Sequence, residues 1–120
     1  MKSYFVTLGF NEAFLLRLLA ETNAVQEDRL VIVVPRPMAE GTKSALENLR
    51  AQALRLRYPP PEVREIGLSS FDSALFEVVS ALNPLPEPVI TDLSMGMRMV
   101  DVLILISLLI TGKQFRAYLR

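Results

Sequence analysis

Short apolar runs rich in β-branched residues alternate along the chain with longer segments of helical periodicity, and this alternation constrains the fold most strongly. The clearest run is Leu30–Val34, which is apolar without interruption and typical of a central strand covered on both faces. Strands that alternate with helices indicate an α/β domain with a mainly parallel sheet. The expected strands are 4–8, 30–34, 63–68, 89–93 and 115–120, and the expected helices are 12–23, 40–57, 69–82 and 95–111.

Right-handed crossovers between these elements predict a Rossmann-like three-layer sandwich with strand order 3-2-1-4-5. The first and fourth strands are then neighbours at the point where the strand order reverses. Ligands of such sheets bind beyond the carboxyl ends of the strands at this switch point. We therefore expect the site where residues 7–11 and 92–98 follow these two strands.

Composition limits the chemistry available to such a site. The chain of 120 residues has the length of a single domain, and it contains neither cysteine nor histidine. Disulfides and thiolate nucleophiles are thereby excluded, and the commonest general base and metal ligand is missing. We expect no catalytic residue, metal or cofactor. The 13 basic and 13 acidic side chains cancel, which excludes nucleic-acid binding through the overall field.

The most apolar segment, Met99–Ile110, is shorter than the roughly 20 residues that a bilayer span requires. The apolar stretch at the N-terminus is also short and lacks a small-residue cleavage site. We therefore expect a buried core helix, a cytoplasmic location and no membrane partner.

The first candidate segment is Thr7-Leu8-Gly9-Phe10-Asn11. A glycine turn lets the backbone approach a ligand closely, and the free N–H groups at a helix start favour an anion. The segment lacks the further glycines of a dinucleotide fingerprint and the Gly-Lys-Ser/Thr of a phosphate loop. A helix capped by Asn11 after a tight turn is the simpler interpretation of these residues alone.

The second candidate segment is Asp92-Leu93-Ser94-Met95-Gly96-Met97-Arg98. Arginine offers a fork of donors to phosphate oxygens, while Ser94 and Gly96 leave backbone amides accessible. The alternative is that Ser94 only caps the next helix and that Arg98 pairs with Asp92 or Asp101. Both segments at one switch point favour an anionic ligand.

Three further polar features are noted, two of which, Arg36 and Asp101, have two interpretations each. Arg36, between two prolines after the second strand, reaches the same rim or is a solvated loop residue. Ser44 and Glu47 predict a capping box. Asp101, inside an apolar helix, faces a partner subunit or pairs with Arg98.

Four stretches of the sequence resemble the N-terminal half of a family of archaeal CRISPR-associated transcriptional regulators. This family joins a CRISPR-associated Rossmann-fold (CARF) domain to a winged helix-turn-helix. The pairing of Thr-Leu-Gly-Phe-Asn with Asp-Leu-Ser-Met-Gly-Met-Arg carries the resemblance, which covers essentially the whole chain. Residues 1–120 are thus expected to form one CARF domain, a fragment or minimal relative without the winged helix. The stretches are Lys2–Asn11, Leu30–Pro35, Gly41–Arg50 and Pro86–Arg98.

The resemblance implies a homodimer whose two switch-point clefts merge. It also implies a cyclic oligoadenylate ligand, usually cyclic tetra-adenylate, made by type III CRISPR systems in antiviral defence. A ring with four phosphates and internal symmetry suits two equivalent subunits. DNA is expected as a partner only through the missing domain. The residues that match the two ligand-binding motifs are Thr7, Gly9, Phe10 and Asn11, then Ser94, Met95, Gly96, Met97 and Arg98.

Two other hypotheses remain open. Some CARF-type proteins cleave their ligand as ring nucleases, with the ribose 2′-hydroxyl as nucleophile. Their motifs tend to carry Thr-Ser where this chain has Phe10-Asn11, and often Lys where it has Arg98. Arg98 could still stabilise a cyclic-phosphate transition state, although turnover without histidine or a tuned lysine should be slow. The third hypothesis is a module that only dimerises, through helix 95–111.

Overall fold

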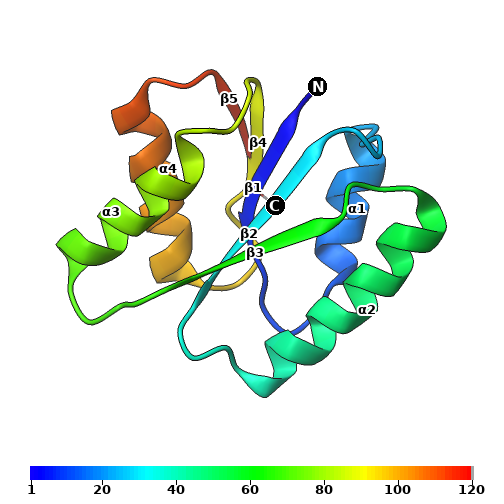
Figure 1. Cartoon of the computed structure of the whole chain (residues 1–120), viewed down its shortest axis with the longest axis horizontal. Helices are drawn as coiled ribbons and strands as arrows, with labels where there is room; N and C mark the ends of the chain where they lie inside the picture. Colours follow the sequence, from blue (N-terminus) through cyan, green and yellow to red (C-terminus); the bar gives the residue numbers. More distant parts are fainter. Residues whose placement is uncertain (120) are drawn as a thin grey trace.

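The computed structural model describes residues 1–119 and contains one five-stranded sheet in the order β3-β2-β1-β4-β5 (Figure 1). Every neighbouring pair of strands is parallel. The predicted Rossmann-like fold and strand order are therefore confirmed. The strands are β1 (Ser3–Thr7), β2 (Arg29–Pro35), β3 (Pro61–Ile66), β4 (Val89–Asp92) and β5 (Phe115–Tyr118), and the helices are α1 (Ala13–Glu21), α2 (Glu40–Leu56), α3 (Phe71–Leu82) and α4 (Arg98–Thr111).

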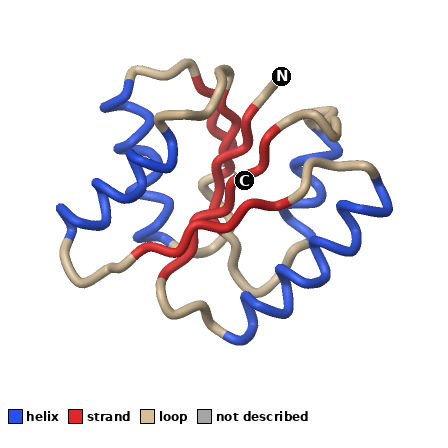
Figure 2. The backbone as a smooth tube through the Cα atoms, viewed as in Figure 1, coloured by secondary structure: helices blue, strands red, loops and turns tan. Residues whose placement is uncertain are grey.

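The helices form two outer layers around the sheet. Helices α1 and α2 cover one face and α3 and α4 cover the other (Figure 1), and the strands form a single twisted layer between them (Figure 2). This arrangement is the predicted three-layer sandwich. It follows from right-handed crossovers. The strand order runs in one direction from β1 to β3 and in the other from β4 to β5, so the first two helices and the last two cover opposite faces of the sheet.

Strand β1 lies at the centre because its side chains are buried on both faces. Tyr4, Val6 and Leu8 belong to the apolar cluster beneath α1 and α2. Phe5 points the other way, into the cluster beneath α3 and α4, as the two-residue repeat of a strand requires. The uninterrupted apolar run of β2 is buried from Leu30 to Val34. The apolar patterning therefore fixes which strands are central.

The predicted start of the fourth helix is wrong, and so is the capping box predicted in the second helix, whose start at residue 40 is confirmed. Helix α4 begins at Arg98 after an N-cap at Met97, so Ser94 does not cap it. Gly96 has a φ of +114° and turns the chain where the helix was expected to run. Helix α2 begins at Glu40 after Ala39, which places Ser44 inside the helix and excludes the predicted capping box. Gly112, with a φ of +68°, ends α4 as expected.

Within residues 1–119, no helix combines the length and the apolar character that crossing a bilayer requires.

Candidate functional site

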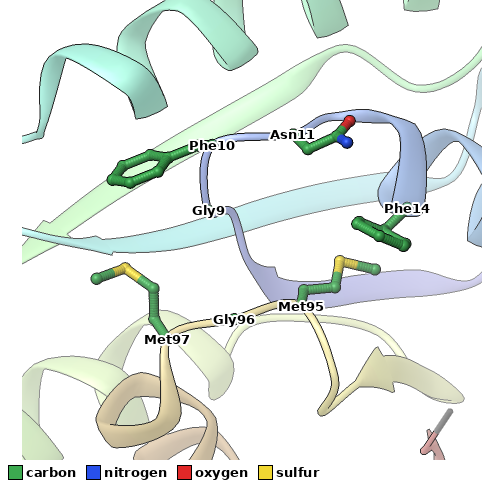
Figure 3. A pocket seen from close by; sticks show the side chains of 7 residues that line it. All are labelled: Gly9, Phe10, Asn11, Phe14, Met95, Gly96 and Met97. Atoms are coloured by element: carbon green, nitrogen blue, oxygen red, sulfur yellow. The ribbon is translucent and has the colours of Figure 1, made fainter.

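The carboxyl ends of β1 and β4 meet at one edge of the sheet, which we call the rim. A cavity of about 270 Å³, the rim cavity, opens there between the loops that follow these strands (Figure 3). Both segments singled out from the sequence contribute to it. It is lined by Gly9, Phe10, Asn11, Phe14, Met95, Gly96 and Met97.

Two glycines hold the loops in this arrangement for different reasons. At Gly9, a Cβ atom would stand 3.1 Å from the backbone oxygen of Met95, so a side chain there would push the two loops apart. At Gly96 there is open space, but the φ of +114° is one that residues with a Cβ rarely adopt. The close approach of the two loops thus depends on both positions.

Phe10 projects from the rim and is 74% exposed, so it does not pack in the core. Its ring lies over Gly41 in the first turn of α2, where a Cβ atom would be 2.6 Å from Phe10 Cδ1. Met97 extends on the side of Phe10, and Met95 on the side of Phe14 (Figure 3). The ring of Phe10 is therefore placed to contact a ligand at the rim.

Asn11 both lines the cavity and starts a helix. Its Oδ1 accepts a hydrogen bond from the backbone N–H of Ala13 at 2.9 Å, which satisfies one of the free donors at the start of α1. The N-cap residue of α1 is Glu12, so the prediction of Asn11 as the N-cap is wrong by one residue, although its side chain still bonds the first turn.

The side chains of Thr7 and Leu8 do not reach the rim cavity. Both residues are buried, at 0% and 1% exposure, because they lie at the end of β1 between the two helical layers. Their contribution to the site is to position Gly9 and Phe10.

Ser94 and Asp92 fix the second loop. The backbone N–H of Ser94 donates to Asp92 Oδ1 at 2.9 Å, and the Ser94 hydroxyl donates to the same oxygen. A smaller cavity of about 70 Å³, the side cavity, lies next to them and is lined by Phe14, Arg17, Asp92 and Ser94. Phe14 lines both this side cavity and the rim cavity.

Neither arginine predicted for the site lines these cavities. Arg98 is exposed and is the first residue of α4. Arg36 is held away from them, because its guanidinium donates to the Glu65 carbonyl oxygen at 3.0 Å and pairs with Glu77 at 3.5 Å.

The sequence interpretation missed Arg17, whose guanidinium carbon lies 5.4 Å from the centre of the Phe14 ring. Its sequence signal was a cation three residues after an aromatic residue near the start of the first helix, a spacing that places both on one helix face. Phe14 itself is 48% exposed.

Asp101 lies in the first turn of α4 and is buried, at 8% exposure. Its Oδ1 has no hydrogen-bond partner within residues 1–119, and no ion pair with Arg98 forms in that range. Burial, with a smaller contribution from the charge of Asp92, raises the pKa of Asp101 to about 6. Of the two interpretations of Asp101, pairing with Arg98 is therefore wrong, and contact with a partner subunit stays a prediction.

In the part of the chain that the structure describes, no cluster of three or more acidic side chains could hold a metal ion. The lining of the rim cavity carries no charged side chain. Its surface consists of aromatic rings, thioethers, an amide and glycine backbone, which suits a planar organic ligand more than a metal ion or a small inorganic anion.

The fold and the site together define a Rossmann-like ligand-binding domain with its cavity at the topological switch point. The chain belongs to the family of the Csa3 CRISPR-associated Rossmann-like domain, whose model matches residues 2–120. This result confirms the CARF resemblance.

A Saccharolobus solfataricus protein named "CRISPR locus-related putative DNA-binding protein Csa3" is 56% identical to this chain over 120 residues. The match covers 100% of this chain and 51% of that protein. The chain thus spans about half the length of the curated relative that it matches.

Proposed function

We propose that this domain senses a cyclic oligoadenylate, foremost cyclic tetra-adenylate, and that it does so as a homodimer. The observation that carries the proposal is the rim cavity, where the two motifs expected to bind this ligand line one space at the switch point. The family membership of residues 2–120 supports it.

The lining suits adenine bases. Phe10 presents an exposed ring and Phe14 is half-exposed, and stacking of a base on an aromatic side chain contributes about 1–3 kcal/mol. Met95 and Met97 add polarisable apolar surface beside these rings. Backbone at Gly9 and Gly96 is open to close approach by sugar or phosphate.

The cavity volume favours a shared ligand. One rim cavity of about 270 Å³ lies below the range of roughly 300–1,000 Å³ that is usual for small-molecule sites. Two such cavities joined across a two-fold axis would fall inside that range. An exposed apolar stripe on α4, directly after the second motif, offers the contact surface. Its members are Met99, Val102, Leu109 and Ile110.

Arg98 is the residue we assign to phosphate binding from the second motif. It stands at the first position of α4, where the free N–H groups and the positive end of the helix dipole also attract anions. Its side chain lies outside the wall of one protomer's cavity, so we assign it to phosphates of a ring that extends over the two-fold axis.

The proposal predicts tight binding of cyclic tetra-adenylate at one ring per dimer in isothermal titration. Arg98→Ala should weaken binding at least tenfold, because it removes a charge-assisted hydrogen bond to phosphate. Arg55→Ala is the matched control, since Arg55 is exposed in the last turn of α2, away from the rim. An equal decrease in affinity in both variants would show a nonspecific charge effect and contradict the assignment.

The same samples should be separated by chromatography after titration. Recovery of the intact ring fits a sensor, whereas linear di-adenylate with a 2′,3′-cyclic phosphate end would establish a ring nuclease instead. If neither cyclic tetra-adenylate nor cyclic hexa-adenylate binds, the sensor proposal fails and a dimerisation module remains.

For the whole regulator we propose that ligand binding controls CRISPR-related transcription. The name of the Saccharolobus relative describes DNA binding, and this chain matches about half of that protein. In our proposal the domain described here supplies the signal, and DNA contacts are made by a winged-helix domain outside these residues.

A further inference from the structure

Resting on the proposed function, we propose that Arg17 and Phe14 form a second phosphate-binding subsite beside the rim cavity, one in each protomer. The subsite takes a phosphate of the nucleotide ligand on Arg17, while the adjoining base or sugar packs on Phe14. Neither residue belongs to the two motifs that the sequence singled out.

The geometry connects this pair to the rim cavity. Phe14 lines both the rim cavity and the side cavity. Arg17 lines the side cavity, and its guanidinium carbon lies 5.4 Å from the centre of the Phe14 ring. The ring restricts the arginine by a cation–π contact. A ligand that leaves the rim cavity past Phe14 therefore meets a positioned, exposed cation.

The ion pairing of the basic side chains near the rim favours the same assignment. Arg36 is paired with Glu77, and Lys43 with Glu40. Within the described residues, Arg17 and Arg98 form no ion pair. A cyclic tetra-adenylate shared equally by two protomers presents two phosphates to each. Arg98 and Arg17 together supply two uncommitted cations per protomer, one for each phosphate.

Asp92 also lines the side cavity and would repel a phosphate placed against it. Its carboxylate is buried, at 2% exposure, and its Oδ1 accepts two hydrogen bonds from Ser94. These donors reduce its negative potential, and Arg17, in contrast to Asp92, is exposed to solvent. The phosphate is accordingly placed on the outer face of Arg17.

The test measures cyclic tetra-adenylate binding to the full chain over a series of NaCl concentrations. Arg17→Gln keeps most of the side-chain length and removes the charge, and we expect affinity to fall about tenfold. The slope of log K against log salt should decrease by about 0.7 for each phosphate that the variant no longer neutralises. Arg17→Lys should recover part of the affinity, because it restores the charge without the planar fork. Arg55→Gln should stay within twofold of wild type.

Each other outcome overturns the subsite. An Arg17→Gln chain that binds within twofold of wild type, with an unchanged salt slope, rejects the subsite and leaves the sensor proposal intact. An unliganded Arg17→Gln chain that melts at a lower temperature, with reduced affinity but an unchanged slope, shows that Arg17 only stabilises the fold. Absence of binding by the wild-type chain rejects both the subsite and the sensor proposal.

Discussion

The two ends of the sheet differ in whether their buried hydroxyl groups are hydrogen-bonded. At the amino end, opposite the rim, the Ser3 hydroxyl donates to the Pro86 carbonyl oxygen at 2.7 Å, and the Tyr4 hydroxyl bonds that of Thr22 at 2.6 Å. At the rim, the hydroxyls of Thr7 and Thr91 are buried without a hydrogen-bond partner in residues 1–119. The amino end is therefore built for stability, and unsatisfied polar groups gather directly below the candidate site.

Two buried aspartates make this contrast sharpest. Burial opposes ionisation of Asp28, but hydrogen bonds from the Lys2 and Val25 amides and from the Lys2 ammonium group outweigh it and lower its pKa. For Asp101 burial meets no such compensation, and its pKa rises to about 6. Proteins usually satisfy buried polar groups, and exceptions are expected at functional sites.

The largest expected effect comes from Asp28→Asn, which should destabilise the domain by about 2–3 kcal/mol at pH 8. The amide removes the ion pair with Lys2 and turns one acceptor into a donor that faces another donor. Because the folded pKa of Asp28 lies below 3.8, its contribution is present above that pH and is lost as the pH falls. Urea denaturation at pH 8 and pH 3 measures the difference, and an equal destabilisation at both pH values would contradict this account.

Asp101→Asn should instead raise the free energy of unfolding at pH 8. Between pH 4 and 6 the folded wild type keeps a proton that the unfolded chain releases, so its free energy of unfolding falls as the pH rises through this window. The shift from 3.8 to about 6 corresponds to a cost on the order of 2–3 kcal/mol above pH 7. The variant, neutral throughout, should be more stable by that amount at pH 8 and equal to wild type near pH 3.5. A variant less stable at pH 8 would mean that ionised Asp101 is compensated.

The order of strands and the location of the rim cavity could be derived from the sequence because both depend on local periodicity and on the handedness of crossovers. The uninterrupted run of β2 marks a central strand, and the loops after β1 and β4 follow from the strand order. These features do not require knowledge of any particular contact between side chains.

The directions of individual polar side chains could not be derived in this way. Ser94 before an apolar segment has the pattern of a cap, but Gly96 turns the chain and Ser94 bonds Asp92 instead. Arg17 lines the side cavity together with the half-exposed Phe14 and with Asp92 and Ser94 of the second loop. Such positions are set by packing between segments distant in the chain, which single-sequence periodicity does not encode.

The smallest expected effects come from a matched pair of Thr→Val substitutions, one at each end of the sheet. Thr22→Val removes the partner of the Tyr4 hydroxyl, which is fully buried, and should destabilise the domain by about 1–2 kcal/mol. Thr91→Val replaces a buried hydroxyl that has no hydrogen-bond partner in residues 1–119 with a methyl group of similar shape, and should stabilise it by about 1 kcal/mol. Urea denaturation of both variants at pH 7 gives the two changes in the free energy of unfolding.

Changes of opposite sign would confirm that the two ends of the sheet differ in whether their buried hydroxyl groups are hydrogen-bonded. Destabilisation by both would show that Thr91 is hydrogen-bonded in solution, and the contrast would then rest on the aspartates alone.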